Sequence, residues 1–201
     1  MRFENPKLRS GLIILAVTLP GIVQANVTAS SSPAAVIPTF GAVSDVINIG
    51  VSETITDVTV DVNITHTFSG DLDVSLESPA GTTVLLYDNN CGADDDIDLA
   101  FDDAGAAIPC PATGGVSAIP DNALSAFDGE NTLGNWTLTV DDVFAGDGGT
   151  LNSWGLNIIS TAAAMMSGPP GSVGGPIGPW ALVLMSLILG ALGFRAQQKR
   201  A

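Results

Sequence analysis

Strict alternation of apolar and polar residues runs through the middle of this chain and predicts β-structure. From residue 58 to residue 65 the even positions are apolar and the odd positions polar: Val58, Val60, Val62 and Ile64 against Thr59, Asp61, Asn63 and Thr65. Successive side chains of a strand point to opposite faces, so this segment is a strand with one buried and one solvated face. Shorter runs at 72–77, 82–87, 136–141 and 154–158 predict further strands. No segment between residues 40 and 160 has helical spacing, which indicates an all-β sandwich or jelly roll.

All six basic residues lie in the first nine or the last seven positions. The first group precedes an apolar run and the small-residue stop Val23-Gln24-Ala25, which predicts a signal peptide over 1–25 with cleavage after Ala25. The second group follows an apolar stretch, 180–194. By the positive-inside bias the extreme C-terminus stays cytoplasmic, and the residues before it are exported to the cell envelope or surface.

Roughly 135 residues remain between leader and tail, which is enough for one domain with its own core. We expect the parts in this order: a linker over 26–42, a β-domain over 43–160, a Gly/Pro-rich tether over 161–179, a transmembrane or sorting helix over 180–194, and a basic tail over 195–201.

Acidic residues dominate the exported part, which contains all of the chain's 21 Asp and Glu residues except Glu4 and has no Lys or Arg before residue 195. Such a surface repels nucleic acid and anionic lipid headgroups, so nucleic-acid binding is excluded. The carboxylates also repel one another unless cations gather on them, and carboxylate oxygens suit calcium. The alternative is a solvated acidic face that needs only diffuse counter-ions.

Two cysteines, Cys91 and Cys110, lie in the stretch from Asp88 to Asp128, where periodicity is weak and Asp, Gly and Pro are frequent. We expect this stretch to be a loop-rich excursion with one short apolar piece, Leu99–Phe101. An even cysteine count in an oxidising compartment predicts a Cys91–Cys110 disulfide.

Four blocks of sequence resemble the P domain, also called P/Homo B, of the proprotein convertases and of bacterial secreted subtilisin-like proteases. They are HTFSGDLDVSLESPAGTTVLL (66–86), AFDDA (100–104), PDNALSAFDGENTLGNWTLTVDD (120–142) and GDGGTLNSWGLNI (146–158). The resemblance implies a jelly-roll β-sandwich of about eight strands, here as a stand-alone exported chain.

A serine-protease triad needs a nucleophile, a histidine base and an orienting acid within hydrogen-bond reach of one another. The chain has one histidine, His66, which shares the inward parity of Ile64 and is interpreted as a structural residue. No Gly-rich nucleophile block surrounds any serine. We therefore expect no catalytic residue and no peptidase activity in this chain. Trp136 and Trp154 lie on apolar parities and are expected in the core.

Calcium is the expected cofactor, because some bacterial P domains similar to this one carry it. Asp102 and Asp103 are the favoured ligands, since they adjoin the apolar anchor Phe101. The further candidates are Asp94, Asp96, Asp98 and Asp141. Turn chemistry is the alternative reading, because Asp also caps turns without any metal.

The tail resembles the tripartite C-terminal sorting signals of Gram-negative bacteria. Gly174-Gly175 looks like the Gly-Gly variant, whereas Trp180 and the run behind it look like the variant built on Ile-Pro-Thr-Leu, of which Pro-Thr-Leu is missing. A plain membrane anchor would give the same topology.

Two functions remain open. The chain is either a non-catalytic, surface-anchored binding or stabilising module, linked to proteolysis by its resemblance, or the accessory subunit of a serine-type endopeptidase encoded separately. Both need a protein partner, a protease or another cell-envelope protein, and membrane contact through the C-terminal helix.

Overall fold

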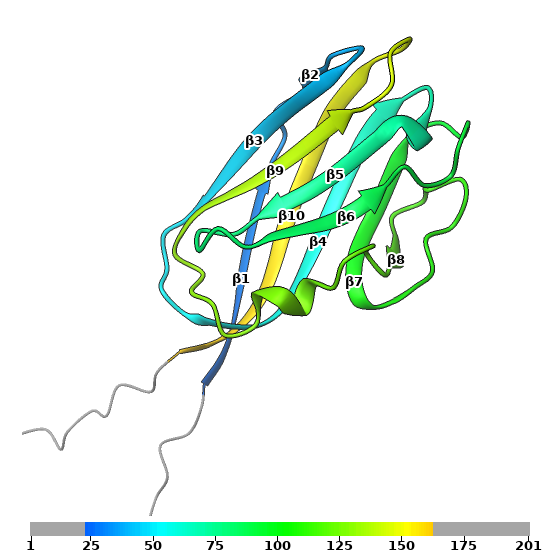
Figure 1. Ribbon diagram of the computed structural model, residues 1–201. Helices are drawn as coiled ribbons and strands as arrows, with labels where there is room; N and C mark the ends of the chain where they lie inside the picture. The colour runs from blue at the N-terminus through cyan, green and yellow to red at the C-terminus, as the bar shows by residue number, and fades with distance from the viewer. Residues whose placement is uncertain (1–22, 163–201) are drawn as a thin grey trace, which may run out of the picture. The chain divides into compact units, whose positions relative to one another are not determined.

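The computed structural model describes residues 23–162, which form two facing β-sheets (Figure 1). The strands are β1 (Val23–Ser31), β2 (Ala35–Ile37), β3 (Gly41–Ile49), β4 (Thr54–His66), β5 (Leu72–Glu77), β6 (Thr83–Asp88), β7 (Ile97–Ala106), β8 (Val116–Ala118), β9 (Gly134–Asp142) and β10 (Gly149–Ala162). Two short 3₁₀ turns, η1 (Ser69–Asp71) and η2 (Leu124–Phe127), complete the described part. The predicted all-β sandwich is confirmed.

The larger sheet, sheet A, has the strand order β1-β10-β4-β7-β8, and β2 also pairs with β10. The smaller sheet, sheet B, has the order β3-β9-β5-β6. All pairs are antiparallel except β7 with β8. Sheet A thus pairs the first described strand, β1, at its edge with the last one, β10.

The core lies between the two sheets and is filled by the inward positions of the alternating strands. Val58, Val60, Val62 and Ile64 of β4 are all buried, as the alternation predicts. Trp136 and Trp154 are also buried, which confirms their expected place in the core. The ring of Phe127 meets that of Trp136 edge to face, with a centroid distance of 5.1 Å. Such burial contributes roughly 1.5–3 kcal/mol for each large apolar side chain.

Residues 26–42 are not a linker, in contrast to the sequence-based expectation. β1 pairs with β10 along its whole length, and β2 and the start of β3 lie in the same segment. Residues 24–30 alternate polar and apolar, with Ala25, Val27 and Ala29 at the less exposed positions, but these side chains are small and a Ser-Pro run typical of a linker follows them. Pairing with β10 makes the segment a strand. Cleavage after Ala25 would leave β1 from Asn26 onward.

The segment 88–128 is also more regular than expected. Its apolar piece is the middle of the ten-residue strand β7, in which Ile97, Leu99 and Phe101 are buried opposite Ile64, Val62 and Val60 of β4. The described residues therefore form ten strands rather than about eight. The jelly-roll connectivity implied by the resemblance stays a prediction.

Residues 23–162 contain no helix with the length and apolarity needed to cross a membrane. The predicted helix over 180–194, the tether and most of the predicted signal peptide lie outside the described residues.

Candidate functional site

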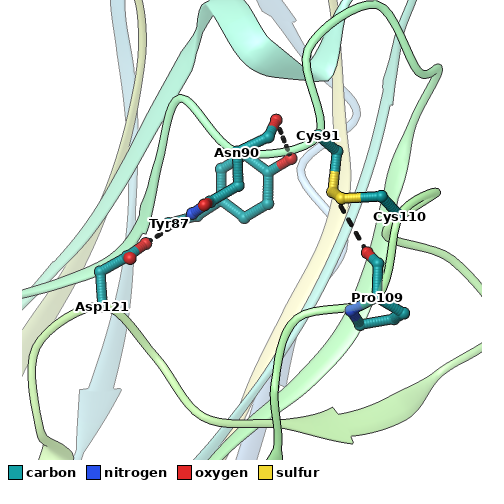
Figure 2. Close-up of a disulfide and its surroundings, with 6 residues drawn as sticks. All are labelled: Tyr87, Asn90, Cys91, Pro109, Cys110 and Asp121. Atoms are coloured by element: carbon teal, nitrogen blue, oxygen red, sulfur yellow. Dashed lines mark hydrogen bonds between the residues drawn. A yellow bond between two sulfur atoms is a disulfide. The ribbon is translucent and has the colours of Figure 1, made fainter.

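The predicted disulfide is present and joins the two arms of the loop region between β6 and β8. Cys91 and Cys110 are bonded, with their Cα atoms 5.1 Å apart. Beside it the Tyr87 hydroxyl donates to the carbonyl oxygen of Asn90 at 2.6 Å, and the Asn90 side-chain amide donates to Asp121 at 2.7 Å (Figure 2). The bridge and these two bonds hold the loop against the end of β6.

Asp94, Asp96 and Asp98 contact different parts of the domain. Asp94 accepts a bond from the Ser69 amide through its backbone oxygen. The Asp96 carboxylate accepts the His66 amide at 3.0 Å, and the Asp98 carboxylate accepts the Asn63 side-chain amide at 3.1 Å. Asp94 and Asp96 precede β7, Asp98 is its second residue, and the three do not form one group of ligands among the described residues.

Asp102 and Asp103, the favoured calcium ligands, accept backbone amides. Both Asp103 oxygens accept amides at the start of η2, from Leu124 at 2.8 Å and Ser125 at 2.9 Å. Asp102 accepts the amide of Ala104 at 2.8 Å. Such bonds satisfy orphan amides at a turn without a cation, as the turn-chemistry alternative expects. A calcium site at this pair stays a prediction.

Asp141 lies on the outer side of sheet B, where its register partners are Ala42 of β3 and Asp73 of β5. Partial burial and the neighbouring carboxylates of Asp88, Asp141 and Asp121 raise the pKa of Asp73. The sheet therefore places like charges side by side here.

A different group of side chains comes together where β4, β9 and the start of β10 meet. His66 Nε2 lies 3.3 Å from Asp142 Oδ2, and neither side chain is exposed to solvent. Ligand atoms of His66, Asp142 and Asp147 all lie within 4.8 Å of one another. We call these three residues, with Asp71, the His66 cluster. Gly149 lets β10 approach it, because a Cβ at this position would lie 2.2 Å from the Thr65 carbonyl oxygen.

Both ring nitrogens of His66 have polar partners. Nδ1 lies 3.1 Å from the Phe68 amide nitrogen and 3.0 Å from the Phe68 carbonyl oxygen, so this end of the ring can accept or donate according to the tautomer. Nε2 lies 3.3 Å from Asp142 Oδ2. Asp142 in turn accepts the amide of Phe144 at 3.2 Å. His66 thus has both ring nitrogens engaged by Phe68 and Asp142, and no serine contacts the ring among the bonds of the described residues.

Carboxylates crowd the rim of the His66 cluster. Burial raises the pKa of Asp71, and the nearby charges of Asp147 and Asp142 raise it further, while His66 opposes this. Asp147 accepts a bond from the Thr67 hydroxyl. Sequence reasoning did not select this cluster, although one signal was available: Asp142 follows Trp136, Leu138 and Val140 on the inward parity, and a polar residue there needs a buried partner.

The sorting-signal residues Gly174, Gly175 and Trp180 lie outside the described residues.

The two facing sheets define residues 23–162 as an all-β module. The model of the family described as Proprotein convertase P-domain matches residues 55–158, more than half of the chain. The chain therefore belongs to the proprotein convertase P-domain family. A second match, to the IPTL-CTERM motif, covers residues 178–200. It includes Trp180 but not Gly174 or Gly175, so it supports the second of the two tail variants.

Curated relatives are much longer than the region they share with this chain. A transglutaminase-activating metalloprotease of Streptomyces mobaraensis is 36% identical over 97 residues, which are 48% of this chain and 10% of the relative. Leupeptin-inactivating enzyme 1 of Streptomyces exfoliatus is 34% identical over 130 residues, 65% of this chain and 24% of the relative. A calcium-dependent protease of Trichormus variabilis is 34% identical over 102 residues, 49% of this chain and 13% of the relative.

Among solved structures, a complex of Aeromonas sobria serine protease with the chaperone ORF2 matches with a TM-score of 0.48 and 22% identity. The match covers 72% of this chain and 28% of that one.

Proposed function

We propose that this chain is an exported, envelope-associated P domain that acts as a non-catalytic binding or stabilising module in proteolysis. The observation that carries this is the condition of His66: the one histidine of the chain is buried and has both ring nitrogens occupied by Phe68 and Asp142. A general base must reach its nucleophile, and a ring enclosed in this way has no position free for a substrate-activating serine.

The alternative is an accessory subunit of a serine-type endopeptidase whose catalytic chain is separate. The relatives favour a link of this kind, because two proteins named as proteases contain the shared region as only 10% and 13% of their length. A module that is covalently joined to an enzyme in one protein can act on it in trans in another. In both proposals the partner is a protein of the cell envelope, and the signal peptide and C-terminal segment bring the domain to it.

We place the proposed calcium ion at the His66 cluster rather than at the six carboxylates selected from the sequence. Two relatives are named calcium-dependent proteases. In this chain ligand atoms of His66, Asp142 and Asp147 lie within 4.8 Å of one another, Asp71 is near enough for its pKa to respond to their charges, and residues 23–162 contain no Lys or Arg to neutralise these carboxylates. The carboxylate oxygens fit a divalent cation in chemistry, and the cation would relieve the repulsion that adds to burial in raising the Asp71 pKa.

The two functions are separated by one pair of assays on the full-length chain. Purified alone, it should hydrolyse neither casein nor dibasic peptides, over a range of calcium concentrations. Added to a protease from the same envelope, an accessory subunit raises the enzyme's rate or its half-life at elevated temperature, whereas a binding module changes neither. Turnover by the purified chain that disappears in His66→Ala while the fold survives would overturn the non-catalytic assignment.

A further inference from the structure

A polar hollow lies on the outer face of sheet A, the face that points away from the core. Its larger part has a volume of about 350 Å³, and a second part of about 260 Å³ shares Ser30, Asp61 and Gly155 with it. These three residues form one row across the strands, because Ser30 of β1 pairs with Gly155 of β10, which pairs with Asp61 of β4. We call this hollow the Gly155 trough. Asp98, Gly115 and Asn157 also line it.

Two glycines keep the trough open beside its two carboxylates. A Cβ on Gly155 would lie 3.8 Å from Asp61 Oδ2, and a Cβ on Gly115 would lie 3.8 Å from Asp98 Oδ2. Each carboxylate therefore has one oxygen next to a position that carries no side chain. At these distances from the carboxylates, an alanine side chain would fit at either position. Close packing therefore does not explain why residue 155 is a glycine.

The trough is lined by serine hydroxyls and by the carboxylates of Asp61 and Asp98, but by no cationic side chain. Asp98 accepts one bond from Asn63 through Oδ1, and Asp61 accepts none within the described residues. The buried Oδ1 of Asn157 also has no donor. Partial burial raises the pKa of Asp61, and the charge of Asp98 raises it further. Because residues 23–162 contain no Lys or Arg, the domain cannot supply the missing positive charge itself.

The size and shape of the trough favour an organic cation over a bare metal ion. A volume of about 350 Å³ equals on the order of ten waters at roughly 30 Å³ each, far more than one ion fills. Calcium needs six to eight oxygens around one point, whereas Asp61 and Asp98 lie on different strands. A guanidinium group instead presents five donors in a planar fork on a long stem, which suits separated acceptors along a groove.

We propose that the Gly155 trough binds an arginine side chain of a partner protein, with the guanidinium between Asp61 and Asp98. The inference deepens the proposed function, on which it rests, by giving the binding module a surface and the partner a basic contact. The stem of the arginine lies over Gly155, and Asn157 offers a further acceptor. Charge complementarity of this kind also speeds the encounter of the two proteins.

The test uses the purified full-length chain and a capped single arginine, N-acetyl-arginine amide, titrated by NMR chemical shifts at low ionic strength. The capped citrulline amide has nearly the same shape without the charge and serves as the ligand control. Asp61→Asn should weaken binding by about tenfold or more, the effect of losing one charged hydrogen bond. Gly155→Leu should do the same by filling the trough without changing any charge. Asp57→Asn, on the same strand and the same outer face but outside the trough, should change the dissociation constant less than about twofold.

Four results would overturn the proposal. Citrulline amide binding as well as arginine amide would remove the role of charge. An equal loss of affinity for arginine amide in Asp57→Asn and Asp61→Asn would show that the ligand is attracted to the acidic surface in general. Calcium binding that Asp61→Asn abolishes, with no arginine binding, would make the trough a metal site. If the chain captures an envelope partner and both Asp61→Asn and Gly155→Leu still capture it, the trough is not the binding site, although the proposed binding function stands. If the trough binds arginine amide but the chain captures no partner, the proposed function is rejected instead.

Discussion

His66 and Asp142 are 76 residues apart in the sequence and are joined by a 3.3 Å contact between Nε2 and Oδ2 that solvent does not reach. The pair links the end of β4 in sheet A to the end of β9 in sheet B. It is therefore a polar connection between the two sheets at the rim of the core, and its first role is structural.

His66→Ala should destabilise the domain, because it leaves the buried Asp142 carboxylate without its donor. Loss of one partner of a buried polar pair costs roughly 2–5 kcal/mol. Thr65→Ala, an exposed neighbour on the same strand, is the control: it removes only the hydrogen bond from the Asn152 amide to the Thr65 hydroxyl and should cost about 1 kcal/mol. Chemical denaturation measures both. Equal stability of the two variants would show that the pair contributes nothing.

The disulfide should account for a measurable part of the stability. Replacing both Cys91 and Cys110 by Ser should lower the melting temperature by several degrees, since a loop of this size is worth about 2–4 kcal/mol. Reducing agent should lower the melting temperature of the natural chain and leave the double variant unchanged. Two titratable free thiols in the natively exported protein would contradict the bridge.

Calcium should stabilise the domain more than sodium does at the same ionic strength, and Asp147→Asn should remove the difference. A ligand that binds only the native state adds about 2.7 kcal/mol at a hundredfold excess over its dissociation constant. Asp103→Asn is the matched comparison: it removes the same charge but belongs to the cap of η2, so it should lower stability without changing the calcium response. If sodium at the same ionic strength stabilised the domain as much as calcium does, the carboxylates would form a solvated acidic face and not a metal site.

Mild acid should stabilise this domain rather than weaken it. Four carboxyl groups have native pKa values raised above the ordinary 3.8, first by burial and then by neighbouring carboxylates: Asp61, Asp71, Asp73 and Asp128. A raised native pKa means that the folded state binds the proton more tightly, so this stability is complete below pH 3.8 and is lost as pH rises through the native pKa. The melting temperature at low salt should therefore rise as the pH is lowered from 7 toward 5, and less steeply in Asp71→Asn. A fall over that interval would refute the prediction.

Much of the fold could be predicted from the sequence, because alternation is a local property. The inward positions of β4, β5, β9 and β10 were correctly located, and so were the two buried tryptophans and the paired cysteines. β1 was missed although residues 24–30 alternate polar and apolar, because the apolar members Ala25, Val27 and Ala29 are small and adjoin the predicted cleavage site. Its partner β10 lies over 120 residues away, and the sequence does not show which distant strand such a segment pairs with.

For the candidate site too, some properties of single residues follow from the sequence and others from the tertiary structure. The sequence by itself determined that the exported part is strongly acidic, that its one histidine faces inward, and that its cysteines are paired, because composition and parity depend only on the order of residues. Which carboxylates meet was decided by the tertiary structure. Asp102 and Asp103 are adjacent in sequence, yet Asp103 caps η2 from a neighbouring strand, whereas Asp142 and Asp147 reach His66 across the sandwich. Ligand geometry depends on distances between strands, and strand order is set by the packing of two apolar faces, which no local pattern specifies.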